Sequence, residues 1–237
     1  MAQKKKSKPI DKAKQAEKAK KKAKSDRLWT IFLIAVCAAI VVLAIIAVIP
    51  SKEPAKVKVE APKFEELGEN QYYFATIEIL DYGTIKVKLD HKEAPITVDN
   101  FVKLAKSNFY EGLTFHRIIE GFMMQGGRTS IPEKMPEPIV GEFSSNGYEN
   151  NISHKRGVIS MARSGNNNDS ASSQFFIMHK TNTKLDGYYA AFGYVVEGID
   201  IVDKICIEAE PTDDNGTIPA AAQPIITSIT IRTEPAA

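Results

Sequence analysis

The residues whose chemistry stands out most lie in the stretch 115–127, which reads FHRIIEGFMMQGG. Its first five residues alternate as a β-strand does, so Arg117 shares a face with Phe115 and Ile119. A guanidinium on such a face needs polar partners or an open pocket, because burying its charge unpaired is costly. Taken alone, the stretch fits either an arginine at the rim of a core strand or an arginine that serves a binding pocket.

A second stretch repeats this mixture of polar and aromatic side chains. Alternation in Gln174-Phe175-Phe176 places Gln174 and Phe176 on the same face of a strand. Core packing explains the Phe and Met residues, but it does not explain why Arg117, Gln125 and Gln174 recur beside them. An arginine, two glutamines and several apolar side chains suit the recognition of an apolar ring next to a peptide amide. The two stretches therefore predict a binding pocket that contains no nucleophile.

Other kinds of chemistry are not indicated by the sequence. The histidines show no metal-ligand spacing, and no glycine-rich phosphate loop is present. Ser160 does not lie in a GxSxG motif, and no Ser/His/Asp arrangement is recognisable. Residues 213–216 have the sequence of a turn and lack the spaced ligands and closing glutamate of a calcium loop. We therefore expect neither a metal ion nor a cofactor.

The elements that must position these residues belong to a chain of 237 residues, 43% of them hydrophobic, which is enough for one good core. Its charge is unevenly distributed. Residues 1–27 hold 12 Lys and Arg against 3 Asp and Glu, a net charge of +9, so the rest of the chain carries −7 of the overall +2. The acidic body gives no reason to expect nucleic-acid binding. The two cysteines, Cys37 and Cys206, form no disulfide framework or CxxC motif.

The first 70 residues read as a membrane attachment. Residues 28–49 carry no charge and would span about 33 Å as a helix, enough to cross a bilayer core. The run is longer than a cleavable signal peptide and lacks a suitable cleavage site, so we expect a retained transmembrane signal anchor. The basic tail at 1–27 predicts a cytoplasmic N-terminus, with the body on the other side of the cell membrane. That tail is expected to be solvated, or held on anionic lipid, and residues 50–70 form a linker.

From residue 71 to residue 237 the pattern is that of a folded domain. Alternating stretches at 75–80 and 84–89 flank Asp81-Tyr82-Gly83 and predict a hairpin. Pro95 opens a helix with an apolar stripe, and a second helix follows residue 198. Further strands are expected at 157–162, 173–178, 190–196 and 224–231. Many short strands with two helices predict a mainly β fold, a closed antiparallel barrel with helices at its ends.

Several of these motifs together resemble the cyclophilin family of peptidyl-prolyl cis-trans isomerases. They are residues 115–127, 157–162, SSQFFI at 172–177, LDG at 185–187 and Phe192-Gly193, and the resemblance runs over about 72–232. It implies a closed eight-stranded antiparallel β-barrel capped by two α-helices. It also implies an enzyme that accelerates rotation about Xaa-Pro bonds in proline-containing polypeptides and so assists their folding. With the body outside the membrane, exported proteins are the expected substrates.

The resemblance also assigns roles to individual residues. It implies that Arg117 is the catalytic arginine and that Gln125 orients it. Ala162 and Gln174 would flank the peptide groove. The proline pocket would be lined by Ile119, Phe122, Met123, Phe176 and Leu185.

Three positions depart from the pattern common in eukaryotic members. Lys184 stands where many of them carry a tryptophan that contacts cyclosporin, so we expect weak cyclosporin binding. Tyr189 replaces a frequent histidine, which is compatible with a bacterial-type site. Arg163 replaces a common asparagine after Met-Ala, which alters how the groove recognises the peptide backbone. Arg163 and Tyr189 complete the predicted substrate-binding set.

Two other functions stay open at this point. A membrane-tethered peptide-binding chaperone would use the same pocket, with catalysis incidental to its role. It would not speed a refolding reaction limited by proline isomerisation, whereas an isomerase would. A structural membrane protein whose basic tail is the working part would lose its function when residues 1–27 are deleted.

Overall fold

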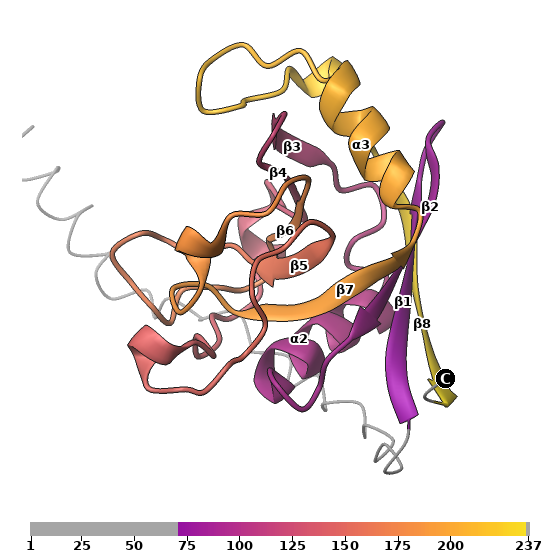
Figure 1. Cartoon of the computed structure of the whole chain (residues 1–237). Coiled ribbons are helices and arrows are strands. Elements are labelled where there is room, and N and C mark those ends of the chain that lie inside the picture. Colours follow the sequence, from indigo (N-terminus) through magenta and orange to yellow (C-terminus); the bar gives the residue numbers. More distant parts are fainter. Residues whose placement is uncertain (1–70, 236–237) are drawn as a thin grey trace, which may run out of the picture. The chain divides into compact units, whose positions relative to one another are not determined.

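The computed structural model describes residues 71–235, all within one unit that spans Ala61–Ala237. Eight strands and two α-helices make up this part of the chain (Figure 1). In chain order they are β1 (Gln71–Ile79), β2 (Gly83–Leu89), α2 (Pro95–Lys106), β3 (Phe115–Ile119), β4 (Met123–Gly126), β5 (Val158–Met161), β6 (Phe175–Met178), β7 (Ala191–Glu197), α3 (Ile199–Glu208) and β8 (Ile226–Pro235). Short 3-10 helices occupy Pro132–Lys134, Ser144–Asn146, Thr183–Leu185 and Ala220–Ala222.

All eight strands form one antiparallel sheet in the order β3-β4-β6-β5-β7-β2-β1-β8. Its two outer strands meet near Thr114 and Ile225, which form a single antiparallel bridge. The N–H of Phe115 donates to the carbonyl of Pro224 at 2.9 Å beside this bridge. The predicted mainly β fold of eight antiparallel strands and two helices is therefore confirmed.

The prediction of a fully closed barrel is wrong. The sheet curves into a half-barrel, and its two outer strands meet at one bridge. The segment that precedes β8 explains why, because it occupies the free edge of β3. The N–H of Ile118 donates to the carbonyl of Gly216 at 2.8 Å, and the N–H of Ile218 donates to the carbonyl of His116 at 3.1 Å. With these backbone groups already paired, β8 has no further ladder to form with β3.

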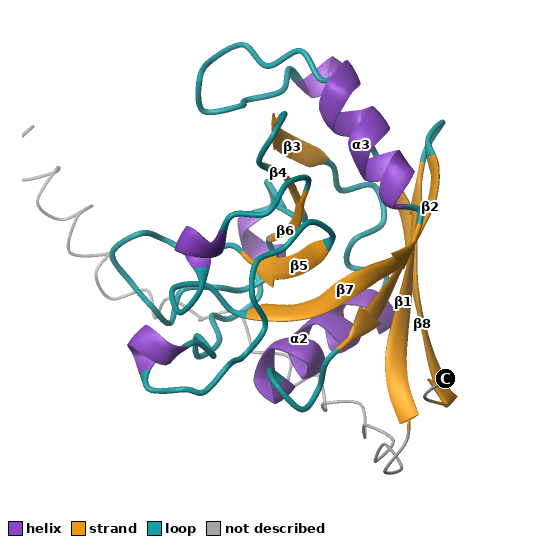
Figure 2. Ribbon diagram, in the orientation of Figure 1, coloured by secondary structure: helices purple, strands orange, loops and turns teal. Residues whose placement is uncertain are grey.

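The two helices lie at opposite ends of the sheet, α3 at the top and α2 at the bottom of the view in Figure 2. The predicted apolar stripe of α2 is buried and includes Val98, Phe101 and Val102. The ring of Phe101 lies 5.5 Å from Phe175 on β6 and 5.2 Å from Phe192 on β7, centroid to centroid. The helix is thus anchored to two strands that carry or adjoin the predicted site.

The first turn of α2 obtains its cap from a distant part of the chain. Ala94 at the N-cap has no side chain that could accept a hydrogen bond. Glu142 takes this place: its two carboxylate oxygens accept the N–H groups of Ile96 and Thr97 at 2.9 and 2.7 Å. Glu142 is only 2% exposed, and its bonds satisfy the buried N–H of Thr97 and the partly exposed N–H of Ile96.

The predicted tail, transmembrane anchor and linker, residues 1–27, 28–49 and 50–70, lie outside the described residues. Among residues 71–235, no helix has the length and apolar character needed to cross a membrane.

Candidate active site

A cavity of about 210 Å³ opens where β3, β4 and β6 meet the loops that follow β5 and precede β7. Arg117 reaches it from β3, Met123 and Gln125 from β4, and Phe176 from β6. The cavity brings together nine of the eleven residues predicted for the site. Its lining consists of Arg117, Phe122, Met123, Gln125, Ala162, Arg163, Phe176, Leu185 and Tyr189.

The other two predicted residues lie directly behind this lining. Ile119 is half-buried against the apolar cluster that contains Met123 and Phe176. Gln174 contacts the lining through Gln125, whose Nε2 donates to its Oε1 at 3.0 Å. All eleven residues therefore gather at one place, nine of them on the cavity wall.

Two oxygen acceptors hold Arg117, one on Nε and one on Nη1, and Sδ of Met123 is a weaker partner of Nη1 at 3.7 Å. The Nε of Arg117 donates to the backbone carbonyl of Asn215 at 2.7 Å, and its Nη1 donates to Oε1 of Gln125 at 3.3 Å. Arg117 and Gln125 are cross-strand partners in the β3–β4 pair, which places their side chains next to each other. Burial lowers the pKa of the Arg117 guanidinium, while Tyr189 and Asp213 oppose the change. The group stays protonated, because an arginine pKa begins so far above neutrality.

The amide of Gln125 has a defined orientation. Because its Nε2 donates to Gln174, its Oε1 faces Arg117. Gln125 is also the cross-strand partner of Phe176 in the β4–β6 pair, so its amide lies on the strand next to the one that carries the aromatic floor. Gln174 thus orients Gln125, and Gln125 orients Arg117.

The floor of the cavity is aromatic. Phe176 is 5% exposed, and the ring of Tyr189 stands edge-on to it with 5.8 Å between centroids. The guanidinium of Arg163 lies 4.9 Å from the centroid of Tyr189 and 5.3 Å from that of Phe143. An apolar ring of modest size can be enclosed between this floor and the fixed cation of Arg117.

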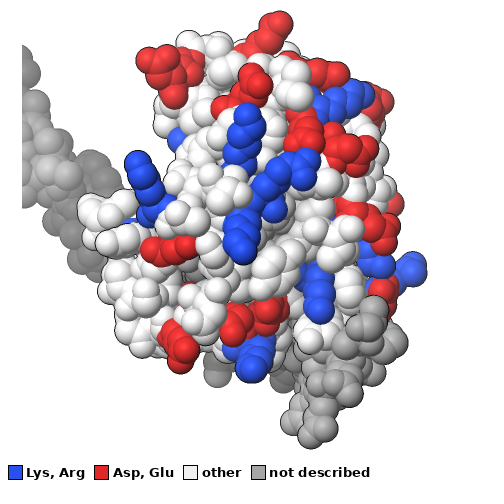
Figure 3. All heavy atoms as spheres, viewed as in Figure 1, with Lys and Arg blue, Asp and Glu red and all other residues white. Residues whose placement is uncertain are grey.

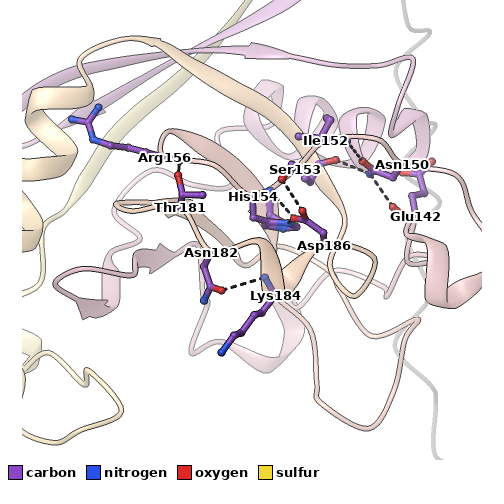
Figure 4. Close-up of polar contacts among 12 residues, drawn as sticks. Glu142, Asn150, Ile152, Ser153, His154, Arg156, Thr181, Asn182, Lys184 and Asp186 are labelled. Atoms are coloured by element: carbon purple, nitrogen blue, oxygen red, sulfur yellow. Dashed lines mark hydrogen bonds and ion pairs between the residues drawn. The ribbon is translucent and has the colours of Figure 1, made fainter.

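A polar chain centred on the buried His154 supports this floor, and Figure 4 shows His154 together with Ser153 and Asp186. His154 contacts Asp186 through Nδ1 at 2.8 Å and Ser160 through Nε2 at 3.1 Å. Its ring stacks on Phe176, with 6.1 Å between centroids and 17° between planes. The structure therefore contains a Ser/His/Asp arrangement that is not recognisable in the sequence. Ser160 and His154 are both fully buried, however, so Ser160 cannot reach a substrate as a nucleophile.

The electrostatics of this chain fix its tautomer. Burial lowers the pKa of His154, so the imidazole is neutral. Burial opposes ionisation of Asp186, yet hydrogen bonds from His154 and Ser153 together hold the pKa of Asp186 below its usual value. The ionised carboxylate must accept, so Nδ1–H donates to Asp186 and Nε2 accepts the hydroxyl of Ser160. No spacing in the sequence signals this chain, because Asp186 lies 32 residues from His154 and only the fold brings the two together.

Within residues 71–235, no three His, Cys, Asp or Glu side chains gather in a way that could hold a metal ion. The fold and the cavity instead define a class of protein, an antiparallel β half-barrel that offers an apolar slot beside a fixed arginine.

The chain belongs to the family described as cyclophilin type peptidyl-prolyl cis-trans isomerase/CLD, whose model matches residues 74–231. A peptidyl-prolyl cis-trans isomerase of Acinetobacter baylyi is 43% identical over 130 residues, which cover 52% of this chain and 66% of the relative. Peptidyl-prolyl cis-trans isomerase A of Dickeya dadantii is 45% identical with the same coverage. A peptidyl-prolyl cis-trans isomerase of Helicobacter pylori is 42% identical over 150 residues, 60% of this chain and 85% of the relative.

A solved structure is similar as well. The cyclophilin type peptidyl-prolyl cis-trans isomerase of Cryptosporidium parvum, crystallised in the presence of the dipeptide Ala-Pro, superposes with a TM-score of 0.58 at 26% identity. The match covers 67% of this chain and 98% of that one. The predicted family is confirmed, and the comparisons support the predicted isomerase function, since this family of enzymes acts on proline-containing peptides.

Proposed function

We propose that the domain at 71–237 catalyses cis-trans isomerisation of Xaa-Pro peptide bonds in polypeptides and so assists their folding. The observation that carries this proposal is the position of Arg117, a fixed guanidinium beside an apolar cavity of about 210 Å³. The proline ring enters the slot formed by Phe122, Met123 and Phe176. Leu185 and Tyr189 complete its wall, Ile119 packs behind it, and Ala162, Arg163 and Gln174 flank the bound backbone.

The reaction needs no bond between enzyme and substrate. A prolyl peptide bond rotates in tens to hundreds of seconds, because rotation breaks the amide resonance. As the amide twists, its nitrogen becomes pyramidal and its carbonyl swings out of the plane. A donor that contacts the twisted state better than either planar state accelerates rotation in both directions. Arg117 is that donor, and its two acceptors keep the guanidinium in place while the substrate turns.

The required stabilisation is within reach of one positioned cation. Shortening the rotation from about 100 s to about 10 ms requires about 5.5 kcal/mol. Preorganised hydrogen-bond donors in sites shielded from water contribute about 3–4 kcal/mol each, and a charged donor contributes more than a neutral one. The aromatic floor supplies the remaining stabilisation, because it encloses the proline ring and holds the substrate in the orientation that the rotation needs.

The test is Arg117→Ala, assayed with a proline peptide whose trans form is cleaved by a coupled protease. We expect kcat/KM to fall at least 100-fold with no change in the unfolding midpoint. Arg117→Lys should recover only part of the rate, because the planar fork is lost. Arg156→Ala serves as the matched control, since Arg156 is an exposed arginine outside the cavity. Wild-type activity in Arg117→Ala would refute the assignment.

We further propose that this domain is a bacterial-type isomerase tethered outside the cell membrane, where it serves newly exported chains. The uncharged run at 28–49 and the +9 tail before it support the topology. Tyr189, together with the bacterial relatives, supports the type of site. Protease added to intact cells should digest the domain, and its full protection would exclude this placement.

Weak cyclosporin binding belongs to the same proposal. Lys184, exposed in the short helix Thr183–Leu185, offers a mobile charge where a flat indole would be needed for packing. Inhibition by cyclosporin should therefore require much higher concentrations than in the variant Lys184→Trp.

A further inference from the structure

Arg163 is a second fixed cation in the cavity. Its Nε donates to the carbonyl of Tyr188 at 2.8 Å, and its Nη1 donates to the carbonyls of Ser164 at 2.9 Å and Gly165 at 3.3 Å. These acceptors occupy two of the three guanidinium nitrogens, and the ring centroid of Tyr189 lies 4.9 Å from Cζ. Among residues 71–235, no acceptor bonds to the remaining nitrogen, Nη2.

The positive charge of Arg163 also has no carboxylate partner among the described residues. The face of the domain seen in Figure 3 mixes both signs of charge, and residues 71–237 hold 21 Asp and Glu against 15 Lys and Arg. The cavity differs in charge from the domain as a whole, since its nine lining residues include two arginines and no carboxylate. Asp213 acts on Arg117. In the described part of the chain no carboxylate forms an ion pair with Arg163, whereas the exposed Arg156 is paired with Asp203.

We propose that Arg163 makes this site selective for proline segments that carry a carboxylate side chain, Asp or Glu, next to the proline or one residue further away. The inference rests on the proposed isomerase function and names the substrate class of the same site. The free Nη2 of Arg163 can donate charge-assisted hydrogen bonds to a carboxylate from a guanidinium that is already held in place, which a flexible lysine does not reproduce. Since the backbone carbonyls already immobilise Arg163, little side-chain entropy is lost when the carboxylate binds.

The local charge outweighs the acidic excess of the whole domain. Charges more than about 8–10 Å away are largely screened at physiological salt, so the distant acids act weakly on a bound peptide. A carboxylate that contacts Arg163 lies well inside that distance. A basic side chain at the same position meets two cations and is rejected, which adds discrimination from the opposite side.

The experiment compares three proline peptides that differ at one position, Glu, Gln or Lys, placed in turn at the two residues before the proline and at the residue after it. Isomerisation is followed by NMR exchange, so that no helper protease with its own charge preference is present. At low salt we expect the wild-type protein to favour Glu over Gln by five- to tenfold in kcat/KM at one of these positions, with Lys below Gln. The preference should shrink at about 0.5 M salt.

The variant Arg163→Gln tests the residue itself. Its readout is the Glu-to-Gln ratio, because lost packing on Tyr189 would lower both rates alike and leave the ratio unchanged. We expect this ratio to fall to about one in Arg163→Gln and to remain partly in Arg163→Lys. The control Lys180→Gln removes an exposed cation outside the cavity and should keep the wild-type ratio.

Equal rates on all three peptides by the wild-type protein, or an undiminished preference in Arg163→Gln, would overturn the inference. If Arg163→Gln fails to fold, the salt dependence of the wild-type ratio and the ratio in Arg163→Lys decide the question. A wild-type protein that isomerises none of the peptides would instead overturn the proposed function.

Discussion

Replacing Glu142 with alanine is expected to destabilise the protein strongly without slowing isomerisation by the molecules that remain folded. Glu142 is 2% exposed and satisfies two backbone donors at the start of α2, from Ile96 and Thr97 (Figure 4 shows its place). It does not line the cavity. Its loss therefore acts on the helix that carries Phe101 into the core, and not on the site.

The magnitude follows from the two hydrogen bonds. Each buried donor left without a partner costs about 1–3 kcal/mol, so two donors cost about 2–6 kcal/mol. Some water can enter the space vacated by the side chain, and we therefore expect about 2–5 kcal/mol. For a domain of this size each kcal/mol lowers the melting temperature by about 2–4 °C. Glu142→Gln should fall between wild type and Glu142→Ala, because its one carbonyl oxygen can accept only part of what the carboxylate accepts.

Urea unfolding of the wild-type and variant proteins, with kcat/KM measured below the transition, tests this expectation. Glu137→Ala is the matched control, since Glu137 lies in the same loop and is exposed. The reasoning is refuted if Glu142→Ala unfolds at the same urea concentration as Glu137→Ala. It is also refuted if the folded variant loses activity, because the cap would then act on the cavity.

Two further expectations concern the histidines. His154→Leu removes the partner of both Asp186 and Ser160 and should lower the free energy of unfolding by about 2–4 kcal/mol; a urea midpoint equal to wild type would contradict this. Burial and Arg128 lower the pKa of His116 from 6.5 to about 4, so the unfolded chain takes up a proton that the native state refuses. Stability should be full above pH 6.5 and decline as the pH falls toward about 4. His116→Gln should flatten that decline in urea unfolding followed against pH, and an unchanged slope would show that other groups cause it.

Much of the site could be predicted from the sequence because its chemistry is local. Alternation within 115–119 identifies the face of Arg117. The role of Gln125 followed from the resemblance to the cyclophilin family, and the structure adds that Gln125 is the cross-strand partner of Arg117. The same periodicities identified the buried stripe of α2 and the hairpin around residue 82. Residues 28–49 remain a prediction from hydropathy alone.

Other features depend on contacts between segments far apart in the chain. Glu142 caps a helix that begins 47 residues earlier, at Pro95. Asp186 meets His154 across 32 residues of chain, although His154 and Ser160 are only six residues apart.

The sequence by itself determined which residues alternate, which helix faces are apolar and which short motifs carry an arginine beside an aromatic slot. Only the tertiary structure decided that the segment before β8 covers the edge of β3, that Arg163 lies against Tyr189 and Phe143, and that a buried histidine supports Phe176. The physical reason is that strand and helix periods act over a few residues. Caps, stacked cations and buried polar chains are set by how the curved sheet brings distant loops together.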